Sequence, residues 1–419
     1  MDSLSTYARE LGENARVASR VLRATTKKQR NDALIALAKQ IRANAKSILT
    51  ANDKDMEEGK TNGLSSALID RLLLNPSRLE GIAKSVEDIS RLPDPLGKLL
   101  GKHARKDGLK ISRVSVPIGV VLFIFESRPN VTIDGAALCV KSGNAVILRG
   151  GKEASRTNAA FGECVRKALR AVKLPEASAQ VVNTTDRALL DVLLRDAAHI
   201  DLVIPRGGEN LIQAVVEKSR IPVVKHYKGV CHTYVDKSAD PKSALAIVLN
   251  AKTQRTGVCN AMETLLLDSN LKPQVGASIL NALAEKGVEL YGDAASKRLF
   301  AGMKPATEET YDIEYLDMKC SVKVVNGVEG AIAHIAQHGT GHTDAVLAKS
   351  PKVQKAFTAG IDSASVMVNA STRFADGGEY GLGAEVGIST DKLHARGPMG
   401  LESLTTYQWI VEGKGHVRK

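Results

Sequence analysis

Apolar residues in the first 92 positions recur three and four residues apart, the spacing of one face of an α-helix. Two helix starts are well marked. Thr26 stands three residues before Gln29, as in a capping box, and Asn75 precedes a proline that suits a first helical position. Prolines at 93 and 95 end this part, because proline cannot donate a backbone hydrogen bond in a helix. The clearest run of the pattern is Leu34, Leu37, Ala38, Ile41, Ala45 and Ile48.

Beyond residue 110, short β-branched runs alternate with helical stretches such as 154–172 and 209–217. Strands separated by helices of this length predict parallel βαβ units with right-handed crossovers. The chain is therefore expected to be α/β, with two doubly wound domains. The first series of strands is expected at 120–124, 145–148, 180–182, 201–204 and 222–224, and the second at 233–235, 264–267, 288–290, 322–325, 345–347 and 365–368.

Two expected strands, 110–114 and 404–411, stand outside this alternation. Neither has a helix of its own, so each needs a partner edge, which a neighbouring subunit could supply. The pattern therefore predicts a homo-oligomer.

Composition limits the cellular setting. Of 419 residues 43% are hydrophobic and 25% charged, and no run approaches the roughly 20 apolar residues that span a bilayer. The first residues lack the basic and then apolar pattern of a signal peptide, so we expect a cytoplasmic protein with no membrane contact. An odd number of scattered cysteines without a CxxC pair argues against disulfides and against a thiolate zinc site. The cysteines are Cys139, Cys164, Cys231, Cys259 and Cys320.

The net charge of +12 admits a nucleic-acid partner, but it suits equally an enzyme that handles phosphates and carboxylates. Only 4% of residues are aromatic and the basic residues are dispersed, which disfavours a stacking surface for single strands. We therefore expect no nucleic-acid partner. A non-catalytic basic nucleotide- or RNA-binding protein of the same fold is kept as the distant alternative.

Cys259 lies in a glycine-softened loop, 253–261, where a thiol can approach a ligand. Arg255 and a helix start expected at Asn260 would both favour the thiolate, the nucleophilic form. A lone cysteine is also often a small buried hydrophobe, and that alternative stays open. The other four cysteines adjoin apolar sequence without a glycine-rich approach, which favours a structural role for each.

Two glycine turns follow expected strands. Arg149, Gly150, Gly151 and Lys152 follow the strand at 145–148, where glycines let backbone amides approach phosphate at a helix start. Cations at this edge favour a 2′-phosphate, so NADP is expected, although a basic turn can occur in any α/β protein. The second turn is Arg206, Gly207 and Gly208. The standard GxGxxG fingerprint is absent, and the similar glycines at 381–387 are expected to form a loop.

Three histidines spaced four residues apart are candidate metal ligands: His334, His338 and His342. Glycines at 339 and 341 interrupt any helix before His342, and no carboxylate stands at zinc spacing, so no metal is expected. No serine occupies a GxSxG elbow, which leaves a serine hydrolase without support.

Three stretches, 125–131, 331–344 and 396–401, together with the Cys259 loop, resemble the aldehyde dehydrogenase superfamily and, within it, the family of gamma-glutamyl phosphate reductases. The resemblance covers nearly the whole chain. It implies a cofactor domain at 1–228 with an oligomerisation hairpin near 103–117, a catalytic domain at 229–385 carrying Cys259, and a C-terminal segment at 386–419 that returns to the core and adds an oligomerisation strand.

By the same resemblance, Arg149 and Lys152 fall where the superfamily holds the adenosine ribose. Lys152 replaces a family glutamate that binds the ribose of NAD, which agrees with NADPH as cofactor. The turn from Arg206 to Gly208 matches one that lies against the cofactor. Glu314 matches a glutamate near the nicotinamide ribose, although the residues after it depart from the usual phenylalanine-glycine-proline.

The resemblance implies that Cys259 attacks L-glutamyl 5-phosphate, expels phosphate and forms a thioester, which NADPH reduces to glutamate 5-semialdehyde in proline biosynthesis. His226 stands where oxidising members keep a glutamate that activates water, a base that a reductase does not need. An ungapped count puts Glu126, a poor donor, at the family's oxyanion asparagine. Asn130 or the backbone amide of Cys259 could take that role.

The two anionic ends of this substrate require cations near Cys259. The partners expected are the substrate, further copies of the chain and, transiently, the glutamate kinase that supplies the acyl phosphate. An acylating or oxidising aldehyde dehydrogenase with another acyl group is the nearest alternative. The candidate substrate-binding residues are Arg128, Lys225, His226, Arg255 and Arg396.

Overall fold

Five helices form the N-terminal part of the chain, as the apolar spacing predicts. In α2, Thr26 accepts a hydrogen bond from the backbone of Gln29, whose side chain accepts one from the backbone of Thr26. Asn75 caps α5 through the backbone of Arg78 at 2.8 Å. Both predicted helix starts are confirmed. The helices are α1 (Ser3–Arg23), α2 (Lys27–Ala43), α3 (Ala45–Thr61), α4 (Ser66–Leu72) and α5 (Pro76–Arg91).

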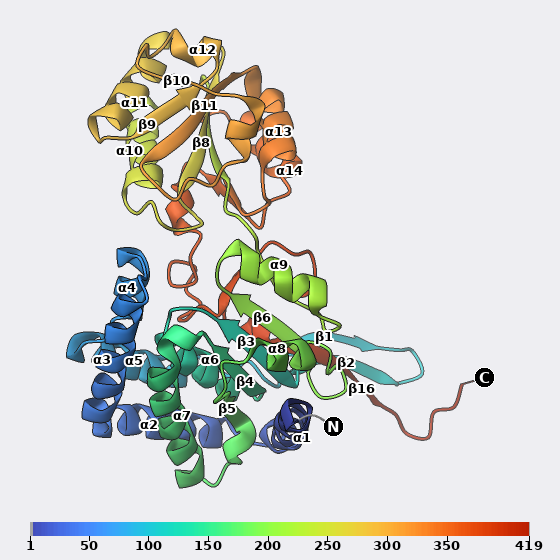
Figure 1. Ribbon diagram of the computed structural model, residues 1–419. Coiled ribbons are helices and arrows are strands. Elements are labelled where there is room, and N and C mark those ends of the chain that lie inside the picture. Colours follow the sequence, from blue (N-terminus) through green and yellow to red (C-terminus); the bar gives the residue numbers. More distant parts are fainter. Residues whose placement is uncertain (1–2, 419) are drawn as a thin grey trace. The chain divides into compact units, whose positions relative to one another are not determined.

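The computed structural model describes residues 3–418, without the side chains of residues 66 and 67. The chain divides into two units (Figure 1). The first unit comprises residues 1–225, 382–387 and 399–419, and the second comprises residues 226–381 and 388–398. A short two-stranded sheet, β14 (Gly387–Ser389) with β15 (Gly397–Met399), lies where the chain passes from one unit to the other.

A four-stranded parallel sheet forms the centre of the first unit, in the order β5-β4-β3-β6. The chain moves from β3 through β4 to β5 and then jumps back to β6 on the other side of β3. Right-handed crossovers therefore place α6 and α7 on one face and α8 on the other. The elements are β3 (Val120–Phe125), α6 (Asn130–Lys141), β4 (Ala145–Gly150), α7 (Ser155–Ala171), β5 (Ala179–Val181), α8 (Arg187–Leu193), β6 (Leu202–Arg206) and α9 (Glu209–Lys218).

The second unit has a seven-stranded sheet in the order β10-β9-β11-β8-β7-β12-β13, with all neighbours parallel. Figure 1 shows α10 and α11 on one face and α13 and α14 on the other. The strands are β7 (Cys231–Val235), β8 (Met262–Asp268), β9 (Glu289–Gly292), β10 (Lys304–Pro305), β11 (Lys319–Val325), β12 (Thr343–Leu347) and β13 (Ser365–Val368). The helices are α10 (Pro241–Thr253), α11 (Pro273–Glu285), α12 (Ala294–Lys297), α13 (Gly327–His338) and α14 (Pro351–Gly360).

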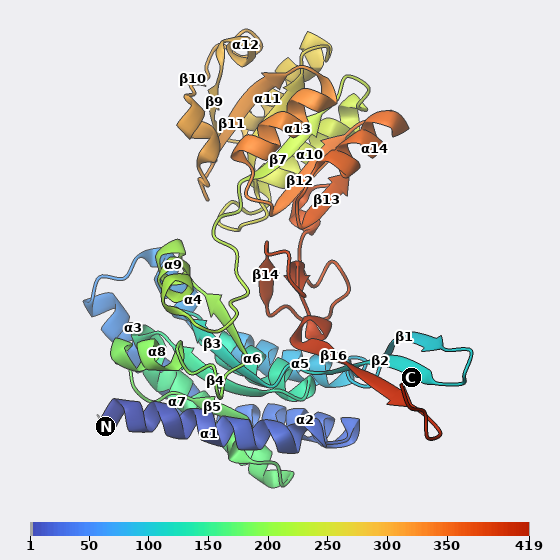
Figure 2. The same cartoon turned by 90° about the vertical axis from the view of Figure 1, so that its right-hand side faces the viewer.

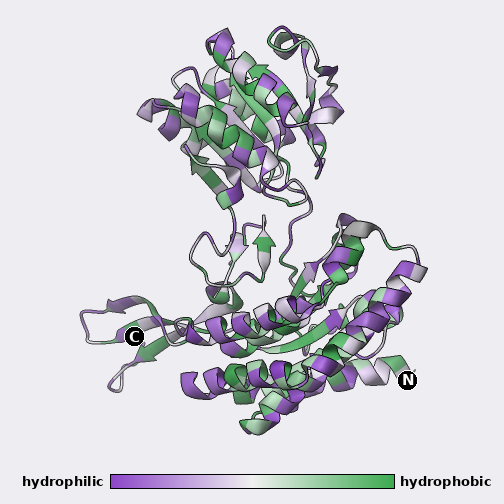
Figure 3. Cartoon of the chain, turned by 90° about the vertical axis from the view of Figure 1, so that its left-hand side faces the viewer, coloured by the Kyte–Doolittle hydropathy of each residue, from purple (hydrophilic) through white to green (hydrophobic). Residues whose placement is uncertain are grey.

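Two hydrophobic cores cover the two faces of this sheet, because successive strand residues point to opposite sides. Val235 and Leu265 belong to the core under α10 and α11, whereas their neighbours Tyr234 and Leu266 belong to the core under α13 and α14. Coloured by hydropathy, hydrophobic residues concentrate in the strands of this sheet and hydrophilic residues on the helices around it (Figure 3). Burial on both faces explains why these strands read as continuous apolar runs.

A three-stranded antiparallel sheet, β1-β2-β16, completes the first unit. Figures 1 and 2 show it projecting from the rest of that unit. The two strands expected to lack partners pair with each other in the same chain, so a neighbouring subunit is not needed to supply their shared edge. The strands are β1 (Leu99–Ala104), β2 (Lys110–Pro117) and β16 (Thr405–Glu412).

The structure corrects one expected strand. Residues 222–224 make only an isolated bridge, between Val223 and Val203, because a ladder needs successive bridges and the residues on either side of Val223 form none. Within residues 3–418, no helix combines the length and apolarity that crossing a membrane requires.

Candidate active site

Cys259 lies half-buried in a turn between the end of α10 and the start of β8. No helix begins at Asn260, so the expected contribution of a helix N-terminus to the thiolate is wrong. The chain instead enters β8 directly. The side-chain amide of Asn260 donates to the carbonyl of Ala375 at 2.9 Å, and this bond anchors the turn to the segment after β13.

The backbone of Gly229 lies directly against the backbone of Cys259. A Cβ at position 229 would stand 2.0 Å from the carbonyl oxygen of Cys259, which no side chain can do. The amide of Gly229 donates to Glu314 at 2.9 Å, so the predicted cofactor residue Glu314 holds the segment before β7 that supports Cys259. Only glycine at position 229 permits this approach.

A second cysteine supports the first. The Cys231 thiol donates to the carbonyl of Cys259, with 3.1 Å between sulfur and oxygen. Burial, followed by the charge of Asp344, raises the pKa of Cys231 well above its usual value. Cys231 therefore keeps its proton and acts as a donor, in agreement with the structural role predicted for it.

Two histidines join Cys259. One ligand-type atom from each of His226, Cys259 and His342 lies within 4.8 Å of the others. Nδ1 of His226 lies 3.1 Å from the carbonyl of Ile388, which can only accept, so this nitrogen carries the proton. The rings of His226 and His342 meet edge to face with centroids 5.7 Å apart.

His342 is almost fully buried, and burial, with a smaller effect of the charge of His226, lowers its pKa to about 3. It is therefore neutral at physiological pH. His334 and His338, which share its spacing in the sequence, lie on α13 with ring centroids 4.6 Å apart, and their rings contact Tyr311. Of the three histidines, His342 therefore lies beside Cys259, whereas His334 and His338 lie beside Tyr311.

All of these groups gather at the amino-terminal edge of the seven-stranded sheet. His226 precedes β7, Cys231 begins it, Cys259 precedes β8 and His342 precedes β12. Because β7 pairs with both β8 and β12, the segments that enter these three strands are neighbours. His342 could have been identified from the sequence as a polar residue shortly before a predicted parallel strand, as His226 and Cys259 also are.

Arg373 is a cation at this site that the sequence interpretation missed. It follows β13, is half-buried, and its Nε donates to the side chain of Gln254 at 2.8 Å. Burial lowers the pKa of Arg373, and the charge of Arg255 lowers it further. The charge of Cys259 opposes this shift, so Arg373 and Cys259 lie within electrostatic reach of each other. Nothing in its local sequence distinguishes Arg373 from a surface arginine.

The other predicted substrate cations are placed differently. Arg255 is exposed in the Cys259 loop. Arg396, also in the second unit, donates to the carbonyl and the carboxylate of Asp362 at 2.9 and 2.8 Å. Arg128 and Lys225 belong to the first unit.

The predicted cofactor residues of the first unit lie at the carboxyl ends of β4 and β6, the two strands on either side of β3. Phe125, the last residue of β3, pairs with Gly150 of β4 on one side and Arg206 of β6 on the other. The strand order reverses between β3 and β6, and ligands of open α/β sheets bind at such a reversal. The two glycine turns predicted from the sequence therefore meet at one edge.

Glutamate carboxylates lie close to two of the glycines in these turns. A Cβ at Gly151 would stand 2.1 Å from the carboxylate of Glu153, and one at Gly207 would stand 2.5 Å from that of Glu126. Gly208 has open space around its backbone, and its amide donates to Glu126 at 3.1 Å. Gly208 is the N-cap residue of α9, and no side chain of the described residues caps this helix.

Basic side chains flank the same edge. Arg149 donates to the carbonyls of Gly150 and Thr185 at 3.2 and 3.0 Å, and burial lowers its pKa. Lys152 is exposed in the next turn. Arg206 lies 3.7 Å from Glu385 of the returning segment.

Asn130, the candidate oxyanion donor, begins α6. Its side-chain amide donates to Asp134 at 2.9 Å. Burial raises the pKa of Asp134 to about 6, an effect that the hydrogen bond from Asn130 and the charge of Arg206 oppose.

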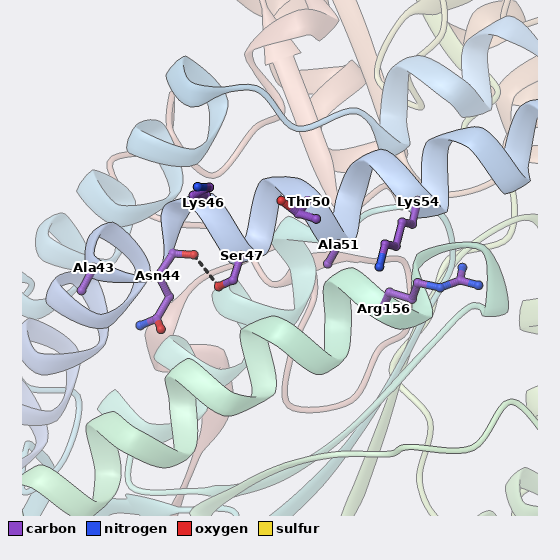
Figure 4. A pocket seen from close by; sticks show the side chains of 8 residues that line it. All are labelled: Ala43, Asn44, Lys46, Ser47, Thr50, Ala51, Lys54 and Arg156. Carbon is purple, nitrogen blue, oxygen red and sulfur yellow. Dashed lines mark hydrogen bonds between the residues drawn. The ribbon is translucent and has the colours of Figure 1, made fainter.

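A surface hollow of about 570 Å³ in the first unit is lined by residues outside the predicted sites (Figure 4). Lys46, Lys54 and Arg156 border it from α3 and α7, and none of the predicted site residues does.

Comparisons with known proteins agree with this architecture. The model of the aldehyde dehydrogenase family matches residues 5–297. Gamma-glutamyl phosphate reductase of Paramagnetospirillum magneticum is 50% identical over 418 residues, which cover 100% of this chain and 98% of that protein. The crystal structure of gamma-glutamyl phosphate reductase from Thermotoga maritima is 42% identical with a TM-score of 0.97, over 98% of this chain and 100% of that one.

The corresponding reductase structure from Saccharomyces cerevisiae is 31% identical with a TM-score of 0.56, over 100% of this chain and 99% of that one. The aldehyde dehydrogenase-like α/β fold expected from the sequence is confirmed. The chain belongs to the aldehyde dehydrogenase family and, within it, to the gamma-glutamyl phosphate reductases.

Proposed function

We propose that this enzyme reduces L-glutamyl 5-phosphate to L-glutamate 5-semialdehyde with release of phosphate, as a step of proline biosynthesis. The names of its full-length relatives support the reaction. Its chemistry is supported by the Cys259 turn, where a half-buried thiol lies beside two imidazoles and within reach of the charge of Arg373.

The nicotinamide cofactor is assigned to the first unit, with NADPH as the form used. The N-terminus of α9 suits a phosphate, because helix N-termini present backbone N–H groups and partial positive charge. The carboxylate of Glu126, which accepts from the amide of Gly208, moves away when the phosphate binds. Arg149 and Lys152 favour the additional 2′-phosphate of NADPH. Glu314 is assigned to the same ligand by family resemblance. When bound, NADPH supplies the hydride that reduces the acyl group.

The Cys259 thiolate attacks the acyl carbon, the bond from carbon to the phosphate oxygen breaks, and phosphate leaves with the bonding electrons. A thioester results. Since hydrolysis would waste this intermediate, no water-activating glutamate is needed at position 226. After reduction the carbon–sulfur bond breaks, its electrons return to sulfur, and the aldehyde leaves with Cys259 again a thiolate. The amide of Cys259 or the side chain of Asn130 stabilises the oxyanion.

The substrate has an α-carboxylate and a phosphoryl group, and cations must offset both. Arg373 and Arg255 are assigned to the substrate in the second unit, with Lys225, His226, Arg128 and Arg396 as the remaining candidates. Arginine suits bidentate carboxylates, and lysine acts as a point charge on phosphate.

The chemical position of Cys259 carries the proposal, and one substitution tests it. Cys259→Ala removes the nucleophile and should abolish phosphate-dependent reduction of NADP⁺ by glutamate semialdehyde, while NADPH binding measured by fluorescence is unchanged. The matched control is Cys164→Ser, in the first unit, which should keep activity near that of the parent. Appreciable turnover by Cys259→Ala would refute the nucleophile. Turnover of plain aldehydes without phosphate would instead favour an oxidising aldehyde dehydrogenase.

We also propose that the enzyme is a cytoplasmic homo-oligomer. In the described chain all cysteines are thiols, which fits a reducing compartment. The sheet β1-β2-β16 exposes Leu99, Tyr407, Trp409 and Val411, apolar area that a second copy would cover. A transient contact with the glutamate kinase would protect the labile acyl phosphate.

A further inference from the structure

The cluster of His226, Cys259 and His342 combines one thiolate-forming sulfur and two imidazoles, the donor set that zinc and other thiophilic divalent cations prefer. All three residues belong to the second unit. We propose that this cluster is a binding site for Zn²⁺ and that occupation of the site reversibly inhibits the enzyme.

The ligand atoms are close enough for one ion. They lie within 4.8 Å of one another, whereas tetrahedral zinc with ordinary bond lengths places its ligands roughly 3.3–3.8 Å apart. Closing the cluster requires movements of about 1 Å, within the range of rotations of the half-buried Cys259 and His226 side chains.

The hydrogen bonds of both histidines match those of metal ligands. Nδ1 of His226 bonds to the carbonyl of Ile388 at 3.1 Å, so Nε2 holds the lone pair. Nδ1 of His342 lies 2.9 Å from the hydroxyl of Thr343. A backbone carbonyl on the second ring nitrogen fixes the ring and the tautomer of a metal-binding histidine, as at His226, whereas the hydroxyl at His342 holds the ring in place.

A further observation points to a ligand. Nε2 of His342 is buried and has no hydrogen-bond partner in the part of the chain that the structure describes, and only 1% of this residue is exposed. A buried polar atom left in this state costs free energy, and a metal ion would satisfy it. Its ring meets that of His226 edge to face, so the two imidazoles are direct neighbours.

Three protein ligands leave one position of a tetrahedral ion open, as in catalytic rather than structural zinc sites. Here the ion would have the opposite effect. Its bond to sulfur removes the nucleophile, so the inhibition rests on the proposed role of Cys259, whereas the binding itself does not.

Cobalt(II) is the direct probe, since a tetrahedral thiolate complex gives intense visible and near-ultraviolet bands. We expect titration of the full chain with Co²⁺, without oxygen or phosphate, to give these bands at one ion per chain. Zn²⁺ should displace Co²⁺ and should lower the reductase rate until a chelator restores it. Zn²⁺ should also slow alkylation of Cys259.

Variants distinguish this site from adventitious thiol binding. Cys259→Ala should lose the sulfur-to-cobalt band, and His226→Gln and His342→Gln should each weaken Zn²⁺ binding at least tenfold, measured by competition with a chromophoric chelator. Cys164→Ser and His199→Asn, in the first unit, should bind as the parent does. Because His342 is buried, the thermal unfolding of His342→Gln is measured as well. If His342→Gln does not fold, the Zn²⁺ affinity of His226→Gln, at a half-buried position, decides between the two interpretations.

Unchanged affinity in His226→Gln, or a cobalt spectrum without a sulfur band, would overturn the zinc site. These results are independent of the reaction. Turnover by Cys259→Ala would refute the proposed nucleophile even if the bands were present, whereas an inactive Cys259→Ala with no bands in the parent would refute the metal site alone.

Discussion

Gly229 lacks a side chain because the backbone of Cys259 occupies the place where one would be. We expect Gly229→Ala to displace the Cys259 turn by an ångström or more and to lower kcat by about 100-fold, the loss that such a misplacement can cause. NADPH binding should be unchanged. Steady-state rates and cofactor titrations measure both quantities.

Gly257 provides the matched control. It lies in the same loop, and a Cβ there meets no atom within 4 Å. Gly257→Ala should therefore keep most of the activity. Equal activity of the two alanine variants would show that the close approach at Gly229 does not matter for catalysis.

Lys152 is the residue on which the NADPH assignment depends most. Replacing this exposed lysine by glutamate puts a negative charge where the 2′-phosphate is expected, so Lys152→Glu should weaken NADPH binding about tenfold, equivalent to roughly 1.4 kcal/mol. NADH binding should improve or stay constant. Lys39→Glu makes the same charge change on α2 and should alter neither NADPH binding nor NADH binding. Parallel losses for both cofactors would contradict a 2′-phosphate contact.

At the scale of elements, β16 joins the proposed assembly. Its side chains Tyr407, Trp409 and Val411 share one exposed face of the sheet, and Arg113 of β2 lies 4.9 Å from the ring centre of Tyr407. Gln408, on the opposite face, accepts from Arg23 of α1 at 2.7 Å. The face of β16 that carries Gln408 is therefore bonded to α1, whereas the face that carries Tyr407, Trp409 and Val411 presents exposed apolar side chains.

We expect Trp409→Glu combined with Val411→Glu to convert an oligomer into a monomer, because buried carboxylates without partners are costly at an interface. Light scattering after size exclusion at micromolar concentration measures the mass, and circular dichroism checks the fold. Gln408→Glu, on the other face, should leave the mass unchanged. A monomeric parent protein would refute the assembly.

Most elements were predictable from local pattern. The helices of residues 3–92, and the strands from β3 to β9 and from β11 to β13, follow spacing, caps and apolar runs that belong to the residues themselves. The two-residue strand β10 was not predicted. The expected strand at 222–224 failed because strand formation requires a ladder partner, which depends on the path of the whole chain. The helix expected at Asn260 failed because the chain enters β8 at Met262, and the ladder partners of that strand, β7 and β11, are not local in the sequence.

At the scale of the whole molecule, buried histidines make stability depend on pH. Burial, with the charges of His232, His338 and Lys323, lowers the pKa of His334 to about 2, and burial lowers that of His342 to about 3. The unfolded chain binds these protons near pH 6.5, so it takes up more protons than the folded chain between about pH 3 and 6.5. The free energy of unfolding must therefore fall as pH drops below about 6.5.

For each of these histidines the loss should approach about 1.4 kcal/mol per pH unit in that range. Urea unfolding at several pH values measures it. His334→Phe keeps an aromatic ring beside Tyr311 and should reduce the slope by about that amount, whereas replacement of the exposed His416 by glutamine should not. A slope unchanged by His334→Phe would refute the assignment.

The sequence by itself determined the fold class and several site residues, because hydrophobic period, helix caps and glycine turns act over a few neighbouring residues. It also singled out Cys259 and His226. Only the tertiary structure decided that His342 and Arg373 join them. Three parallel strands bring together the entry segments that carry His226, Cys259 and His342, across more than 100 residues of chain, and the segment after β13 brings Arg373 within electrostatic reach of Cys259. Contacts of that range depend on strand order, which no local spacing encodes.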